Sequence, residues 1–198
     1  MKIDFELKRK IFHLFFGTAI LLLIYYKILS LLMLSGLMLI AIILSAIASR
    51  RRLPVISFLL KEFDRNEKIP GKGGLTFLTG ILIVWLLFKN SPDIVLASTA
   101  VLTYGDSFSS IFSKYIGRTK HPFSKHKLLE GTIAGIIASF LSAMFFVSAA
   151  EALICSITAM AVEAISIKRK EFFLDDNITI PITAALTLAI IRLIYGFL

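Results

Sequence analysis

Hydrophobic positions along the chain gather into seven long apolar runs, separated by short segments in which polar residues concentrate. These runs are comparable with the length of about 17–25 residues that a helix needs to cross a bilayer. The pattern therefore predicts seven membrane-spanning helices. They cover residues 11–26, 28–48, 74–88, 93–117, 131–149, 151–167 and 178–198. The polar stretch 49–73 contains one further predicted helix, at residues 55–63, on the membrane surface.

The composition agrees with this pattern and excludes a soluble domain. Of the 198 residues, 57% are hydrophobic and only 18% are charged, and the mean hydropathy is +0.85. We expect an all-α polytopic membrane bundle that forms one integral-membrane domain over residues 1–198, with cytoplasmic loops at 49–73 and 118–130. The single cysteine, Cys155, excludes a disulfide within one chain.

The basic residues are distributed unevenly between the two sides of this predicted bundle. Nineteen of the 22 Lys and Arg residues fall before residue 11 or within 50–72, 114–127 and 168–170, which all lie on one side. The positive-inside rule therefore predicts a cytoplasmic N-terminus and a multi-pass protein of the cell membrane. The net charge of +9 then reflects topology and attraction to anionic membrane lipids, so no nucleic-acid partner is expected.

Asp106 is the most unusual residue of the pattern because it lies well inside a predicted span. An ionised side chain there costs about 2.5–3.5 kcal/mol on insertion scales, so it needs a partner or a function. Read as a helix, the same face carries Ser109, Ser110, Ser113 and Gly117. Asp106 is either a structural carboxylate paired with a lysine such as Lys114, or a Mg²⁺ ligand or general base.

Further acids lie near the cytoplasmic ends of two other spans. Glu163 is either directed toward the interface beside Lys168 or Arg169, or part of a site. Asp175, Asp176 and Asn177 open the last span, where helix capping explains one acidic residue. Acids that recur on three cytoplasmic segments are what a Mg²⁺-phosphate site needs, because the metal prefers hard oxygen ligands.

Two further groups of residues lie on the same, cytoplasmic side of the predicted bundle. Gly71-Lys72-Gly73-Gly74 precedes the third span, where it forms either an interfacial turn or a set of backbone N–H groups for phosphate. Arg9, Lys10 and His13 stand at the entrance of the first span. As topology signals they need no function, and His13 is equally well read as an interfacial or a catalytic residue.

Four of these motifs, taken in order, resemble the polyprenol kinase family, which includes dolichol, phytol and farnesol kinases and the CTP-dependent diacylglycerol kinase. The matching patterns are Arg9-Lys10-x-x-His13, Asp106-x-x-Ser109-x-x-x-Ser113-x-x-x-Gly117, Lys127-Leu128-Leu129-Glu130-Gly131-Thr132 and Asp176-Asn177-x-x-x-Pro181. Two positions depart from the family pattern: Ser113 replaces a glycine, and Leu128 replaces a small hydroxyl residue.

The resemblance implies CTP-dependent phosphorylation of a membrane lipid alcohol of the dolichol or polyprenol type. CTP would be the phosphoryl donor and Mg²⁺ the cofactor, at the cytoplasmic face of the cell membrane, or of the endoplasmic reticulum in a eukaryote. The implied catalytic residues are Asp106, Glu130, Glu163 and Asp176, with Asp106 and Asp176 as metal ligands. Nucleotide binding would fall to Lys72, Ser109, Ser113, Gly117, Arg118, Lys127, Gly131 and Asn177, and acceptor binding to Arg9, Lys10 and His13.

Three other functions stay open at this point. A CDP-lipid synthase, which transfers a cytidylyl group to a phosphatidate-like lipid, would also combine an acid, small residues, a basic stretch and Lys-x-x-Glu-Gly. An ion-coupled transporter would use Asp106 and Glu163 as ion sites, although the sequence has no evident inverted repeat. A structural membrane subunit would leave the intramembrane acids unexplained.

Overall fold

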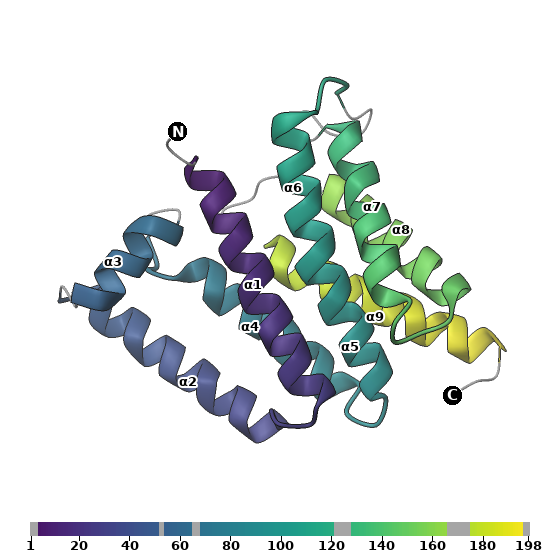
Figure 1. Cartoon of the computed structure of the whole chain (residues 1–198). Coiled ribbons are helices and arrows are strands. Elements are labelled where there is room, and N and C mark those ends of the chain that lie inside the picture. The colour runs from purple at the N-terminus through teal and green to yellow at the C-terminus, as the bar shows by residue number, and fades with distance from the viewer. Residues whose placement is uncertain (1–3, 52–53, 65–67, 121–127, 166–174, 196–198) are drawn as a thin grey trace.

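The regular structure that the computed structural model describes is helical throughout, as predicted (Figure 1). The description covers residues 4–51, 54–64, 68–120, 128–165 and 175–195. Its elements are α1 (Phe5–Tyr25), α2 (Leu31–Ala48), α3 (Pro54–Phe63), α4 (Lys72–Leu87), α5 (Pro92–Ala100), the π-helix η1 (Val101–Gly105), α6 (Asp106–Tyr115), α7 (Leu129–Ala143), α8 (Ala149–Ile165) and α9 (Asp176–Tyr195).

Helices stand at each of the seven predicted spans and at the predicted surface helix, but the number of spans supported is smaller. By length and composition, three segments can cross a membrane: Leu31–Ala48, Pro92–Tyr115 and Asp176–Tyr195. Lys72–Leu87 and Leu129–Ala143 are apolar but shorter. The first turns of α1 carry Glu6, Lys8, Arg9 and Lys10, so the first half of that helix is less apolar than its second half. A membrane bundle is therefore plausible, while the count of seven spans is not confirmed.

The break between α7 and α8 comes earlier than the sequence pattern predicted. The chain turns at 144–148 rather than at 149–151. Ser148 precedes α8, and its backbone N–H donates to Glu151 Oε2 over 2.9 Å, while the Glu151 N–H lies 3.4 Å from Ser148 Oγ. This reciprocal arrangement is a capping box. The Ser-x-x-Glu spacing was the local signal that places the start of this helix.

The segment α5–η1–α6 runs as one continuous helical rod through the centre of the described bundle. It contacts α1 and α7 along its length, and α9 lies against it as well; Figure 1 shows α1 and α7 beside it. Its residues from Ile94 to Ser109 are mostly buried. The π-turn Val101–Gly105 lies directly before Asp106. Such turns hold one extra residue and frequently occur at functional sites.

Helices α4 and α9 approach closely at Gly80 for a reason visible in α9. Pro181 lies inside this helix and has no backbone N–H, so it cannot donate to the carbonyl of Asn177 four residues earlier. That carbonyl oxygen lies against Gly80, where a Cβ would overlap it and would also lie 3.1 Å from Pro181 Cγ. The spacing Asn177-x-x-x-Pro181 therefore sets a backbone contact between two helices.

Arg192 lies near the C-terminal end of α9 and links three helices. Its guanidinium forms an ion pair with Asp93 in the first turn of α5, and its Nε lies 2.8 Å from Glu151 Oε1 in α8. The pairing explains how α9 keeps a cation in its last turn, because a half-buried guanidinium needs anionic partners. It also fixes the end of the bundle opposite to the N-terminus of α9.

We expect Gly80→Ala to destabilise the protein, because the added methyl group has no space between α4 and α9. A strained core substitution of this kind costs about 1–3 kcal/mol. Gly36→Ala in α2 is the matched control, since nothing lies within 4 Å of its Cβ position and Ala is favoured over Gly in a helix. Thermal unfolding in detergent measures both. Equal unfolding temperatures for the two variants would contradict the close contact.

Candidate functional site

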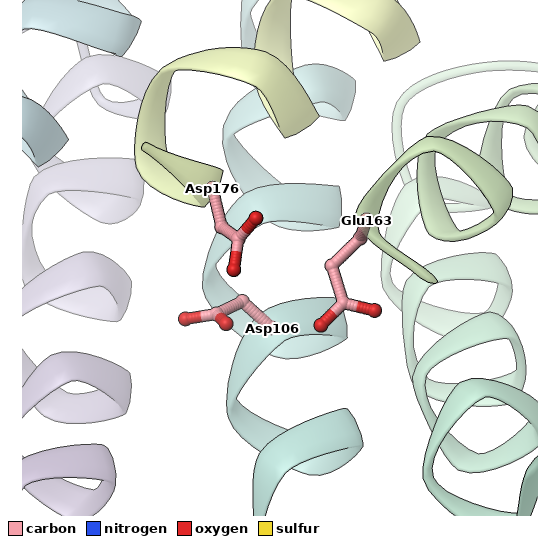
Figure 2. A group of neighbouring side chains, drawn as sticks. All are labelled: Asp106, Glu163 and Asp176. Atoms are coloured by element: carbon pink, nitrogen blue, oxygen red, sulfur yellow. The ribbon is translucent and has the colours of Figure 1, made fainter. Parts of the chain in front are cut away.

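Three carboxylates from three different helices converge in the bundle. Asp106 begins α6, Glu163 lies in the last turn of α8, and Asp176 begins α9. One oxygen of each lies within 4.8 Å of one oxygen of each of the others, and Figure 2 shows the three side chains close to one another. Asp106 and Glu163 are buried, with 4% and 0% of their surface exposed. The sequence separates these acids by up to 70 positions, so only the fold brings them together.

Helix α1 supplies the cation and the imidazole beside this carboxylate group. Lys10 Nζ donates to Asp106 Oδ2 over 2.5 Å, and both side chains are buried. His13 lies one turn further along α1, with its Nε2 3.7 Å from the same oxygen. That nitrogen is buried and has no hydrogen-bond partner among the described residues. Two of the three residues expected to bind the acceptor therefore lie at Asp106.

The partner of Asp106 is thus not the one that the sequence suggested. Lys114 lies two turns further along α6 and forms an ion pair with Asp4 at the start of α1. The Glu163 side chain is fully buried, and its alternative partners Lys168 and Arg169 lie outside the described residues. Helical spacing placed Lys114 near Asp106, but it could not reveal a neighbour from a distant helix.

The three polar residues at the start of α9, Asp175 to Asn177, make different contacts. Asp175 accepts hydrogen bonds through Oδ1 from the Asn177 N–H at 3.0 Å and from Thr76 Oγ1 at 3.1 Å. Asn177 Nδ2 donates to Gly73 O at 3.3 Å and to Thr76 Oγ1 at 3.0 Å. Capping is therefore performed by Asp175, which leaves Asp176 to face the other acids. Asn177 joins the beginning of α9 to that of α4.

Lys72 lies at this same junction. It is the first residue of α4, follows the left-handed Gly71 at φ 73°, and is only 8% exposed. The N–H of Gly71 donates to Asp64 Oδ2 over 2.8 Å, which fixes the turn that precedes the helix. The glycine-rich segment therefore forms a defined turn that buries a lysine near the N-termini of α4 and α9.

The serines expected along one face of α6 contact three neighbouring helices, α1, α7 and α8. Ser109 Oγ lies 3.4 Å from both carboxylate oxygens of Glu163. A Cβ on Gly131 of α7 would overlap Ser113 Oγ and the carbonyl of Ser109. Ser110 instead lies beside Lys10 in a small hollow between α1 and α6. The small residues at 109, 113 and 131 thus allow α6 and α7 to pack closely next to the acids.

Glu130 is not part of the three-carboxylate group. It stands in the first turn of α7, where its two oxygens accept the Thr119 N–H at 2.9 and 3.2 Å. Hydrogen bonds from its own backbone N–H and from the side chain and backbone N–H of Thr119 lower the pKa of Glu130 to about 2. This carboxylate therefore stays ionised at physiological pH and joins the two ends of the segment 119–130.

The remaining predicted residues lie around this segment and at the start of α1. Gly117 packs against Leu128 and the carbonyl of Ser113, and Arg118 is exposed. Arg9 pairs with Glu6 over 2.6 Å. Lys127, which the sequence assigned to the nucleotide, lies outside the described residues.

Comparisons with known proteins agree with the motifs, at low sequence identity. The chain is 25% identical over 165 residues to a probable phytol kinase 2, chloroplastic, of Oryza sativa, covering 76% of this chain and 53% of that protein. It is 29% identical over 145 residues to a farnesol kinase, chloroplastic, of Arabidopsis thaliana, covering 66% and 46%. An uncharacterized protein of Methanocaldococcus jannaschii is 29% identical over 189 residues, covering 91% of both chains.

The chain spans about half the length of the plant relatives that it matches. No family model matches the sequence, and no solved structure matches it. The chain is therefore a distant homologue of proteins named phytol kinase and farnesol kinase.

Sequence reasoning missed three features of the site. It did not pair Lys10 with Asp106, did not separate Asp175 from Asp176, and did not single out Gly80. The Gly80 contact had a readable signal in Asn177-x-x-x-Pro181, since a proline inside a helix leaves the carbonyl four residues earlier without its usual donor. The pairing with Lys10 had no local signal, because 96 residues separate the two side chains.

We expect Mg²⁺ to stabilise the protein by binding to the three carboxylates, whose hard oxygens suit this ion. At 100 times its dissociation constant, a ligand adds about 2.7 kcal/mol, which corresponds to about 5–10 °C in unfolding temperature. Glu163→Gln should remove most of this increase. Glu62→Gln, which changes a carboxylate that pairs with Lys8 on the surface, should retain it. A loss in both variants, or in neither, would exclude the carboxylate group as the binding site.

Proposed function

We propose that this protein is a membrane kinase that transfers the γ-phosphoryl group of CTP to the hydroxyl of a prenyl-type lipid alcohol. The convergence of Asp106, Glu163 and Asp176, together with the Lys10 ammonium paired to Asp106, supports this function most directly. Phosphoryl transfer requires mainly positioning and neutralisation of charge. A compact group of carboxylates with a buried ammonium beside it is the arrangement that this chemistry uses.

The donor set fits a magnesium ion. It consists of carboxylate oxygens from three helices, and Mg²⁺ binds through one or more carboxylates together with the phosphates of its nucleotide. Asp106 and Asp176 are the proposed ligands, with Glu163 as a third. A bound magnesium ion would neutralise charge on the triphosphate.

The protein's own cations would act on the same phosphates. Lys72 lies buried at the N-terminus of α4, beside the N-terminus of α9 through the Asn177–Gly73 contact. Helix N-termini favour anions because their free N–H groups and dipoles face outward. Lys72 and these helix ends therefore form the proposed phosphate-binding face, with Arg118 and Lys127 as further expected contacts from the cytoplasmic side.

The acceptor hydroxyl would lie beside His13 and Asp106. The hydroxyl must lose its proton as it attacks phosphorus, and a group within hydrogen-bond reach must accept that proton. His13 Nε2 is buried, lacks a hydrogen-bond partner in the described chain and lies 3.7 Å from Asp106. We assign it as the proton acceptor, with Asp106 orienting the imidazole or the hydroxyl.

The relatives support the class of acceptor, because the curated names that the chain matches are phytol kinase and farnesol kinase. The predicted topology would place the reaction at the cytoplasmic face of the cell membrane, where CTP is available. The apolar helices are compatible with such a location.

The proposal predicts label transfer from γ-labelled CTP to a prenyl alcohol by the purified protein with Mg²⁺. Asp106→Asn should lower kcat/KM by at least about 100-fold, since each 1.4 kcal/mol of lost transition-state stabilisation is tenfold. Glu62→Gln is the control and should keep its activity. ATP in place of CTP tests the choice of donor.

The products separate this function from its nearest alternative. A kinase releases CDP, whereas a CDP-lipid synthase releases pyrophosphate and needs a lipid phosphate as its acceptor. Pyrophosphate release with phosphatidate, together with no labelled lipid from any alcohol, would reject the kinase. Activity that survives in Asp106→Asn would reject the proposed site.

A further inference from the structure

A long apolar groove lies on the side of α6 that faces away from the carboxylates. Its volume is about 950 Å³. Leu21 and Tyr25 of α1 form one wall, the α7 residues from Glu130 to Ser142 form the other, and Phe108 and Phe112 of α6 form the floor. Phe108 follows Asp106 by two positions, which is about 200° around a helix. The groove therefore belongs to a separate face of the bundle, and the phosphoryl-transfer chemistry does not account for it.

The groove meets the candidate site at one end. Glu130 lines that end, and the next residue, Gly131, packs directly on Ser109 and Ser113. Ser109 Oγ in turn lies 3.4 Å from Glu163. A continuous row of small polar groups thus crosses the contact between α6 and α7, from the end of the groove to the carboxylates.

The lining favours an uncharged molecule with a long apolar part. Aromatic and aliphatic side chains predominate, and Glu130 is the ionised group among the lining residues that the structure describes. An anionic lipid phosphate at this end would lie next to the Glu130 carboxylate, and like charges repel each other. A hydroxyl can instead donate a hydrogen bond to such a carboxylate.

The groove is also limited in length. Its lining on α7 extends from Glu130 to Ser142, a rise of about 18 Å at 1.5 Å per residue. Beyond this, the Tyr25 and Phe146 rings contact each other with centroids 6.1 Å apart, and both border the groove. An extended isoprene unit contributes four carbon–carbon bonds of about 1.5 Å, which advance the zigzag chain by about 5 Å along its axis, so roughly four units fill the distance.

We propose that this groove binds the hydrocarbon chain of the lipid alcohol, with about four isoprene units along α7 and the end that carries the hydroxyl leaving the groove beside Glu130 toward His13 and Asp106. The inference rests on the proposed kinase function and adds to it the position and the length of the acceptor. The part of a longer polyprenol that extends past the Tyr25–Phe146 pair would gain no further contact with the lining residues that the structure describes. Selectivity for chain length then resides on α7, apart from the residues that perform the chemistry.

The first test changes the depth of the groove. Ala138 lines its middle part, so Ala138→Phe should block longer chains. The ratio of kcat/KM for geranylgeraniol, with four isoprene units, to that for geraniol, with two, should fall at least tenfold. Ala161→Phe is the matched control, because Ala161 is exposed on α8 away from the groove. This control should keep the wild-type ratio, and an unchanged ratio in Ala138→Phe would overturn the proposal.

The second test does not depend on catalysis. Asp106→Asn protein in lipid nanodiscs is photolabelled with a diazirine analogue of geranylgeraniol, and the labelled peptides are identified by mass spectrometry. Label on the α6 and α7 residues of the groove, displaced by geranylgeraniol but not by its phosphate, is the expected result. Label distributed over all exposed helices would overturn the groove. Specific label on the groove together with no kinase activity in the wild-type protein would reject the proposed function and retain the binding site.

Discussion

Repulsion among the three clustered carboxylates is the constraint on which the arrangement of the bundle depends. Two unit charges 4 Å apart interact with about 4 kcal/mol at an effective dielectric constant of 20, and three such groups lie within 4.8 Å of one another. A nearby positive charge offsets part of this repulsion. Lys10 supplies one such charge through Asp106, so α1 is attached electrostatically to the central rod as well as by its apolar face.

The scaffold holds these acids through contacts between backbones rather than through long side chains. Gly80 lets the carbonyl of Asn177 rest against α4, and Gly131 lets α7 rest against α6. Because both contacts use the main chain, α6 and α9, two of the three helices that carry an acid, are fixed within less than the length of a side chain. This rigidity matters for a site whose catalysis consists of positioning, where small displacements are costly.

Much of this arrangement was predictable from the sequence, and the limits of prediction are physical. Hydrophobic periodicity located the helices, and the acid spacing indicated that Asp106, Glu163 and Asp176 act together. Helix ends were less accurate, since the capping box at Ser148 and Glu151 was overlooked and the turn at 144–148 was placed too late. The neighbour of Asp106 could not be derived, because pairing between distant helices depends on how they pack. For the same reason the groove beside Phe108 and Phe112 was not foreseen.

The π-turn before Asp106 has a consequence for how this site is encoded. Val101–Gly105 holds one residue more than an α-helical turn would. Removing a single residue there would give an ordinary helix in which everything after it is rotated by about 100° and moved by about 1.5 Å. Asp106 would then leave Lys10, and the aromatic floor of the groove would turn away at the same time. The number of residues in this turn therefore sets the orientation of both faces of α6, whichever side chains the turn carries.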